Sequence, residues 1–225
     1  MSITITIVII IVTCIVSFLS FSNSDLENKL IFYPPAVSQN NEWYRFFSCG
    51  LIHKDIPHLL FNMYALYLFG QGQGESGVEF DFMLIFKDLG KLLYLLLYVS
   101  ALGVCLIPTY NSHKNNSQYR SLGASGAVSA VVFAYILFNP MQGVGLIFLP
   151  IFIPGFLFGI IYLLISYWLS KKGGSNINHS AHIWGALFGI VFVLIACRLF
   201  GDYPVLANFW QSIKTFNLSK LFSTY

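Results

Sequence analysis

The sequence predicts an all-α membrane protein, a single domain in which six transmembrane helices form a bundle. Of its 225 residues, 56% are hydrophobic and only 9% are charged, whereas about 25% of the residues of a soluble domain are usually charged. Apolar segments alternate with polar connections along the chain. A segment of about 20 apolar residues spans a bilayer as a helix, because its backbone polar groups must find partners within the segment.

The first apolar segment covers residues 3–21. No Lys or Arg precedes Lys29, whereas a signal peptide has a basic start and a shorter apolar core. We therefore expect a retained transmembrane helix. The second segment, 57–72, is short and partly polar. The other four are residues 91–109, 123–139, 146–169 and 180–200.

The connections differ in character. Residues 22–56 form a long loop that contains the aromatic, amphipathic stretch "EWYRFFSCGLIH", which is typical of a segment in the membrane interface. Residues 73–90 are acidic with an apolar patch, "FMLIF", and are also expected in the interface. No repeat with a fixed period is present. A length of 225 residues suits one domain, so residues 1–225 are predicted to be one domain.

Charge and cysteine content exclude several functions. The net charge is only +3, and no basic patch interleaves with aromatic residues, so we expect no nucleic-acid partner. Cys14, Cys49, Cys105 and Cys197 are scattered, with no metal-binding or redox spacing. They are predicted to be packing residues.

The positive charges do not decide the orientation in the membrane. With the N-terminus in the cytoplasm, the cytoplasmic segments hold five basic residues, Lys87, Lys91, Arg198, Lys214 and Lys220. The opposite side then holds seven, Lys29, Arg45, Lys54, Lys114, Arg120, Lys171 and Lys172. This count slightly opposes that orientation under the positive-inside rule, and the margin is small.

Polar residues stand near the N-terminal ends of the second, fourth and sixth segments. These residues are His58 and Asn62, Ser125, and His182. In a six-helix chain these three helices enter the membrane from the same face, so the polar residues are expected on one side and at similar depth. Ionisable residues inside a membrane are costly and indicate a functional site.

The residue types suit nucleophilic catalysis. The hydroxyl of Ser125 is a weak nucleophile until a base takes its proton, and His182 is the natural base because its ordinary pKa of about 6.5 suits proton transfer near neutrality. His58 and Asn62 lie four residues apart on one helix face, and both side chains can donate hydrogen bonds to one anion.

Each feature also has a structural alternative. A serine in a transmembrane helix usually bonds to its own backbone or to a neighbour. Gly185 and Gly189 form G-x-x-x-G, a general packing motif. His179 and His182 have the spacing of two metal ligands, but no third ligand lies beside them in the sequence. The coincidence of all three polar clusters on one face favours catalysis.

Three motifs occur in order along the chain. They are "HKDIPHLLFN", with His53, His58 and Asn62; "GASG", with Gly123, Ser125 and Gly126; and "AHIWGALFG", with Ala181, His182, Gly185 and Gly189. From about residue 43 to residue 190 the sequence resembles the rhomboid family of intramembrane serine proteases, whose patterns H-x-x-x-x-H-x-x-x-N, G-x-S-G and A-H-x-x-G-x-x-x-G they match.

The resemblance implies a six-helix rhomboid-like bundle with a Ser–His dyad, in which Ser125 is the nucleophile and His182 the general base. It implies an oxyanion hole formed by His58, Asn62 and the backbone N–H of Ser125. Gly123 and Gly126 are expected to allow close packing and to expose backbone N–H groups around the nucleophile.

The resemblance also assigns supporting residues. Arg45 with the aromatic before it is similar to an interfacial "W-R" in the family, although Tyr44 stands where Trp is usual and Trp43 lies one residue earlier. Glu75, after "GQGQG", is similar to a structural carboxylate at the end of the second helix. His53 is the first histidine of the first motif.

One departure concerns the orientation of the base. Ser129 lies four residues after Ser125, where many members of the family carry a Tyr that stacks on the catalytic His. The sequence leaves open what orients His182 instead: a hydrogen bond to Ser129, or packing on Trp184 or Tyr162.

The function that the resemblance implies is hydrolysis of peptide bonds in or near transmembrane segments of membrane-protein substrates. It implies no cofactor and no metal, the lipid bilayer and transmembrane proteins as partners, a cytoplasmic N-terminus, and an active site toward the extracytoplasmic face. The alternatives are a catalytically inactive rhomboid-like protein that binds membrane clients, and a small transporter or metal-binding protein. A transporter requires inverted repeats or broken helices, and the sequence shows neither.

Overall fold

The structure, a computed structural model, describes residues 3–72, 76–146, 149–172 and 177–216. The described chain is mostly helical. Its α-helices are α1 (Ile5–Phe21), α2 (Ser24–Leu30), α3 (Pro34–Asn40), α4 (Arg45–Ser48), α5 (Ile56–Leu66), α6 (Val78–Phe86), α7 (Gly90–Val104), α8 (Ile107–His113), α9 (Ser125–Phe138), α10 (Gly155–Lys172), α11 (His179–Ala196) and α12 (Val205–Lys214). Short 3-10 turns are η1 (Cys49–Leu51) and η3 (Lys87–Leu89), and π-helical turns continue α5 as η2 (Tyr67–Gln71) and α11 as η4 (Cys197–Gly201).

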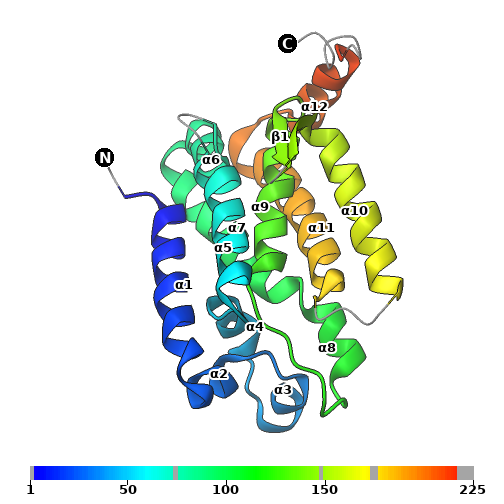
Figure 1. Cartoon of the computed structure of the whole chain (residues 1–225). Coiled ribbons are helices and arrows are strands. Elements are labelled where there is room, and N and C mark those ends of the chain that lie inside the picture. Colours follow the sequence, from blue (N-terminus) through cyan, green and yellow to red (C-terminus); the bar gives the residue numbers. More distant parts are fainter. Residues whose placement is uncertain (1–2, 73–75, 147–148, 173–176, 217–225) are drawn as a thin grey trace.

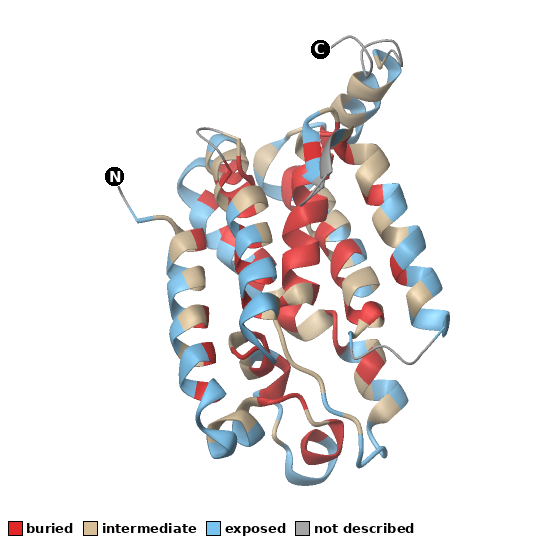
Figure 2. Cartoon of the chain, in the orientation of Figure 1, coloured by how far each residue is buried: buried red, intermediate tan, exposed pale blue. Residues whose placement is uncertain are grey.

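Helix α9 is the centre of the bundle. In Figure 1, α1 lies on one flank and α10 on the other, while α2, α3 and α8 gather at one end. All residues of α9 from Gly126 to Leu137 are buried, and the helix is correspondingly red along most of its length in Figure 2. A helix that is apolar on all sides belongs in the interior of a bundle, so α9 is held by neighbouring helices along its length.

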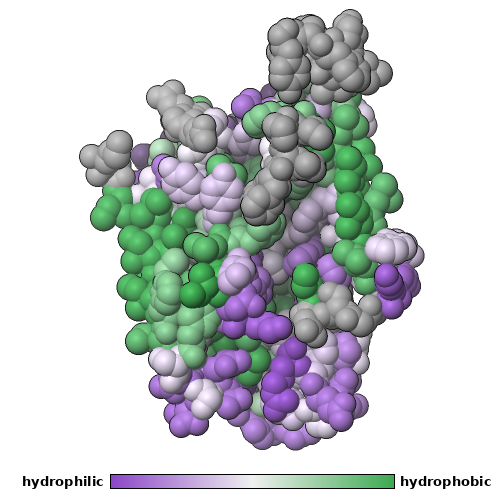
Figure 3. Space-filling model, viewed as in Figure 1, coloured by the Kyte–Doolittle hydropathy of each residue, from purple (hydrophilic) through white to green (hydrophobic). Residues whose placement is uncertain are grey.

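The surface has an apolar zone that suits lipid. Hydrophobic side chains cover the flanks at α1 and α10, and hydrophilic ones gather at the end formed by α2 and α3 (Figure 3). Two helical stretches, Val78–His113 and His179–Gly201, are long and apolar enough to span a membrane by length and composition, and α1 and α9 are shorter apolar helices. The described helices overlap all six predicted segments.

Capping residues set where three of the helices begin. The side chain of Thr4 accepts a hydrogen bond from the backbone N–H of Ile7 at the start of α1. Asp55 does the same for His58 at the start of α5, where a proline stands in the first turn, and Asn178 caps α11. Such caps satisfy backbone donors that a helix leaves unpaired. They fix the starts of α5 and α11, near which the predicted site residues stand.

A hairpin replaces the first part of the fifth predicted helix. Strands β1 (Gly143–Leu146) and β2 (Leu149–Pro154) pair antiparallel, with Gly143 opposite Pro154. The prediction that the fifth helix begins at residue 146 is wrong. The physical reason is Pro150 and Pro154: proline lacks a backbone N–H and clashes with the preceding turn of a helix. Helix α10 begins immediately afterwards, at Gly155.

One predicted connection and one predicted segment also differ from the structure. The stretch expected to be an interfacial connection, 73–90, contains α6, which buries Val78, Phe82 and Phe86 in the same core as α7 and α9. The third predicted segment, 91–109, divides into α7 and α8. Proline stands in the first turn of α8, where it is tolerated but cannot continue a preceding helix.

Helices α9 and α11 form the most extensive helix–helix contact. Gly185 and Gly189 of α11 lie against the backbone of α9. A Cβ atom at Gly185 would lie 2.0 Å from the carbonyl oxygen of Gly126, and one at Gly189 would lie 2.3 Å from that of Ala130. Both glycines are therefore required by the close approach, as the G-x-x-x-G spacing predicts. This approach brings the N-terminal ends of the two helices together.

Candidate active site

Ser125 and His182 are in direct contact. Ser125 is the first residue of α9 and His182 lies in the first turn of α11, and the Ser125 Oγ to His182 Nε2 distance is 2.7 Å. Both side chains are half-buried. A nucleophile within about 2.6–3.2 Å of a base is the geometry that proton transfer requires. The structure thus joins two residues that are 57 positions apart in the sequence.

Gly123 allows His58 to approach the loop before Ser125. Its φ of +108° is one that residues with a side chain rarely adopt. A Cβ atom here would lie 2.7 Å from Cε1 and 3.0 Å from Nε2 of the His58 ring. The glycine therefore places the His58 imidazole beside the backbone that leads into Ser125.

Asn62 lies one turn further along α5 and is buried. Its Nδ2 donates a hydrogen bond of 2.9 Å to the carbonyl oxygen of His58. An amide nitrogen carries two hydrogens, and this bond uses one of them. The bond also fixes the amide orientation relative to the turn that carries His58.

His53 is a buried link between α1 and the loop before Ser125, residues 114–124. Its Nε2 accepts a 3.4 Å hydrogen bond from the backbone N–H of Ala124, and its Nδ1 lies 3.0 Å from Ser17 Oγ. Ser17 uses its single hydroxyl hydrogen on the carbonyl of Leu51, so we assign the ring hydrogen to His53 Nδ1. Burial lowers the pKa of His53 to about 3, which keeps the ring neutral and able to accept this bond.

The sequence did not single out Ser17. A serine inside an apolar first helix gives no signal that it contacts a histidine 36 residues later. The contact between Ser17 and His53 exists only because the fold places α1 beside the segment before α5.

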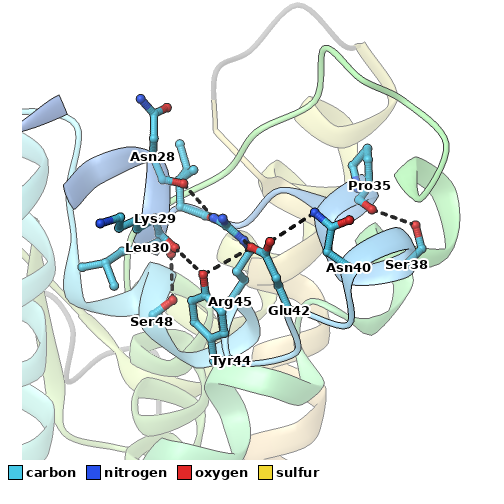
Figure 4. A network of polar contacts seen from close by, with 11 residues as sticks. Asn28, Lys29, Leu30, Pro35, Ser38, Asn40, Glu42, Tyr44, Arg45 and Ser48 are labelled. Atoms are coloured by element: carbon cyan, nitrogen blue, oxygen red, sulfur yellow. Dashed lines mark hydrogen bonds and ion pairs between the residues drawn. The ribbon is translucent and has the colours of Figure 1, made fainter. Parts of the chain in front are cut away.

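Arg45 is buried and organises the first loop (Figure 4). Its Nη1 donates to the carbonyl oxygens of Asn28 at 2.8 Å and Ile31 at 2.7 Å. Its Nε forms an ion pair with Glu42, and this hydrogen bond holds the pKa of the Glu42 carboxyl below its usual range. Tyr44 donates from its hydroxyl toward the Lys29 carbonyl and Glu42.

The first loop, residues 22–56, in turn supports the loop before Ser125. The backbone N–H of Phe32 donates to the carbonyl of Ser121 at 3.0 Å, and the reverse bond is 3.1 Å. The N–H of Gly123 donates to the carbonyl of Cys49 at 2.9 Å. Because Arg45 holds Ile31, the residue before Phe32, the predicted supporting role of Arg45 has a physical path to the site.

Replacing Arg45 with alanine is expected to lower the free energy of unfolding by about 1.5 to 3 kcal/mol, the usual value of a hydrogen bond to a charged group. The carbonyl oxygen of the buried Ile31 and that of Asn28 lose their donor. The measurement is thermal unfolding in detergent. Arg120→Ala is the matched control, because Arg120 is exposed and packs over the Tyr33 ring. Equal losses for the two variants would contradict this role of Arg45.

Glu75 lies outside the described residues. Four residues later in the sequence, Glu79 of α6 is a buried carboxylate that the sequence did not single out. It accepts hydrogen bonds from the backbone N–H groups of Ile5 at 2.7 Å and Thr6 at 2.8 Å, and from the Thr6 hydroxyl at 2.8 Å. An anion at a helix N-terminus is favourable, so Glu79 anchors the start of α1 to α6.

The open question of what lies against His182 has an answer in the structure. Tyr162 of α10 stacks on the His182 ring. Ser129 Oγ donates to the Ser125 carbonyl oxygen and lies 2.6 Å from the Tyr162 hydroxyl. Trp184, the other aromatic candidate, is 47% exposed.

His179, which has the spacing of a second metal ligand, is buried with its ring edge-on to the His182 ring. Within the described part of the chain, no group of three His, Cys, Asp or Glu side chains has the arrangement of a metal site.

Comparisons with known proteins agree with this architecture. The family model described as "Rhomboid domain" matches residues 40–199. The chain is 31% identical to "RHOMBOID-like protein 12, mitochondrial" of Arabidopsis thaliana, over 60% of this chain and 40% of the relative. It is 29% identical to "Presenilin-associated rhomboid-like protein, mitochondrial" of Homo sapiens, over 72% of this chain and 41% of the relative.

A bacterial relative is covered more fully. The chain is 26% identical to "Rhomboid protease GlpG" of Haemophilus influenzae, over 76% of this chain and 78% of that protein. By contrast, the match spans only about two-fifths of the length of the mitochondrial relatives. Since the family model covers well over half of the chain, this protein is a membrane protein that belongs to the rhomboid family.

Proposed function

We propose that the protein is an intramembrane serine endopeptidase, which hydrolyses peptide bonds in or near the transmembrane segments of membrane-protein substrates. The observation that carries the proposal is the 2.7 Å contact between Ser125 Oγ and His182 Nε2. It lies at the N-terminal ends of two helices packed backbone to backbone. A serine with only a structural role has no need of a base at this distance.

The chemistry follows from the two side chains. His182 Nε2 accepts the Ser125 Oγ proton as Oγ bonds to the substrate carbonyl carbon. The C–N bond then breaks as His182 returns that proton to the leaving amine, which leaves an acyl group on Ser125. Water attacks the acyl carbon and gives its proton to His182. That proton returns to Oγ as the ester bond breaks and the carboxyl product leaves.

The oxyanion is assigned to donors on two helices. Ser125 begins α9, and the first backbone N–H groups of a helix point outward at the positive end of its dipole. The His58 ring lies beside Gly123, and the Asn62 amide lies in the next turn of α5. Preorganised donors of this kind stabilise the charge that develops on the carbonyl oxygen.

The length of α9 supports a site below the membrane surface. Its 14 residues span about 21 Å at 1.5 Å per residue, whereas the hydrocarbon core is about 30 Å thick. With the far end of α9 at one boundary, Ser125 lies about 9 Å inside the other. A substrate bond reaches this depth when it lies in or near a transmembrane segment.

We also propose the domain organisation, membrane orientation and partners that the sequence predicts. Residues 1–225 form one domain with six spans, made by α1, α5 with η2, α7, α9, α10 and α11. The N-terminus is cytoplasmic and the site faces the extracytoplasmic side, as the family resemblance implies. Transmembrane proteins and the lipid bilayer are its partners, and the dyad chemistry uses no cofactor or metal.

Reconstitution tests the proposal. The native chain in liposomes is expected to cleave a single-span model substrate at a bond in or near the span, with the site located by mass spectrometry. Thermal unfolding establishes that the native chain and Ser125→Ala are equally folded. Cleavage by Ser125→Ala at the native rate contradicts the proposal, and a native chain that binds the substrate without cleaving it favours the client-binding alternative.

Replacing His58 or Asn62 with alanine is expected to lower kcat by about 10²–10³-fold, the usual effect of losing one oxyanion donor. Some activity and probe labelling are expected to survive, because other donors stay in place. The measurement is single-turnover cleavage in liposomes. Native rates in both variants mean that these side chains are structural and that backbone N–H groups hold the oxyanion.

A further inference from the structure

Tyr162 of α10 faces the base of the dyad. Its ring centroid lies 6.2 Å from that of His182, with an interplanar angle of 28°, within the range in which offset aromatic rings attract each other. Phe133 and Phe158 pack on the Tyr162 ring at 5.7 Å and 6.0 Å between centroids. The ring of His182 is therefore bounded by an aromatic side chain that is itself packed on two others.

A hydrogen-bonded chain fixes the Tyr162 ring. Ser129 Oγ donates to the carbonyl oxygen of Ser125 at 2.8 Å, and it lies 2.6 Å from the Tyr162 hydroxyl. A serine hydroxyl has one hydrogen, which this geometry gives to the Ser125 carbonyl. Tyr162 is then the donor to Ser129. Ser129 thus ties the ring on α10 to the same residue that carries the nucleophile.

Tyr162 belongs to the face of α10 that packs on the bundle. Gly155, Gly159 and Ser166 are the buried residues of this helix, and Tyr162 lies three residues after Gly159 and four before Ser166, so all share one helix face. A Cβ atom at Gly159 would lie 3.2 Å from the Ile136 side chain of α9. Small residues on this face bring α10 close enough for Tyr162 to reach Ser129.

We propose that Tyr162 is the positioning residue that orients the His182 imidazole toward Ser125, and that Ser129 holds the Tyr162 ring in place for this task. The inference rests on the proposed function of the dyad and adds to it a residue from a third helix. Ser129 stands four residues after Ser125, one turn further along α9. In this chain the ring comes from α10, and the short side chain of Ser129 leaves room for it and binds it.

The test compares variants that remove the ring, the hydroxyl or its acceptor. Tyr162→Leu is expected to lower kcat about 10- to 10²-fold, the scale of a catalytic group misplaced by about 1 Å, with KM within about twofold because substrate binding is not affected. Tyr162→Phe keeps the ring but loses the tether, which is the hydrogen bond from the Tyr162 hydroxyl to Ser129. Its kcat is therefore expected to fall less, about two- to fivefold.

A double-mutant cycle tests the tether. Ser129→Ala is expected to match Tyr162→Phe, and Ser129→Ala with Tyr162→Phe together to be no worse than either alone, because both remove the same bond. Tyr167→Leu is the matched control: it makes the same substitution on the same helix at a residue that is 58% exposed. It is expected to retain the native kcat and KM. Thermal unfolding reports the folded fraction of every variant.

The outcomes separate this inference from the proposed function. A native chain that neither cleaves nor reacts with a fluorophosphonate overturns both. If the native chain is active and Ser125→Ala is inert, then native kcat in Tyr162→Leu overturns the inference alone. The inference is also overturned if kcat falls as far in Tyr162→Phe as in Tyr162→Leu. It is overturned as well if the unfolded fraction of Tyr162→Leu accounts for its whole loss of kcat.

Discussion

Replacing Ser125 or His182 with alanine is expected to lower kcat by on the order of 10⁶, the loss seen when a serine nucleophile or its base is removed from a hydrolase. Ser125→Ala has no atom to form the acyl intermediate, and His182→Ala leaves the hydroxyl without a base at 2.7 Å. KM and thermal stability are expected to change little. Single-turnover cleavage in liposomes measures the effect.

Ser100→Ala is the matched control for this prediction. Ser100 is also a serine within an apolar helix, and its hydroxyl bonds to the Leu96 carbonyl of its own helix, which is the structural role of such serines. Its removal is expected to leave kcat unchanged. Similar losses in Ser100→Ala and Ser125→Ala would show that the Ser125 variant acts through folding.

Replacing Gly185 with alanine is expected to cause the next largest loss. The added methyl would lie 2.0 Å from the carbonyl oxygen of Gly126 and 2.8 Å from its carbonyl carbon. Both are backbone atoms and cannot rotate away, so α11 must move relative to α9. Overpacking of this kind typically costs about 1–3 kcal/mol. A 1 Å displacement of His182 from Ser125 is expected to lower kcat about 10²-fold.

Gly103→Ala separates this effect from a general intolerance of methyl groups. A Cβ atom at Gly103 in α7 would meet only the Phe47 ring, at 3.3 Å, and that side chain can adjust. Near-native stability and activity are expected for Gly103→Ala, and a fall in both for Gly185→Ala. Native kcat in Gly185→Ala would contradict the claim that close packing of α9 and α11 aligns the dyad.

The sequence predicts much of the site because its signals are local. His58, Ser125 and His182 each stand near the N-terminal end of an apolar segment, and counting the segments places them on one face. The structure puts the latter two in contact and His58 beside Gly123. The G-x-x-x-G spacing of Gly185 and Gly189 likewise predicted a close helix contact, which the structure places between α11 and α9. Their chemical roles stay predictions until they are measured.

Other features depend on tertiary contacts that no spacing reveals. The sequence named Tyr162 only as one of several candidates to orient His182, because its partner Ser129 lies 33 residues away on another helix. The anchoring of α1 by Glu79 spans 73 residues. The hairpin before α10 is a different case: its prolines were visible in the sequence, and the apolar run outweighed them in the prediction.

The most direct test of the central claim is site-resolved labelling with a fluorophosphonate probe, which reacts with an activated serine and needs no substrate. Purified native chain, Ser125→Ala and His182→Ala are incubated with the probe, and mass spectrometry locates the adduct. We expect one adduct on Ser125 in the native chain, none in Ser125→Ala, and a labelling rate lowered by orders of magnitude in His182→Ala. An adduct on another residue, or labelling of Ser125 at the native rate without His182, would contradict a Ser125–His182 dyad.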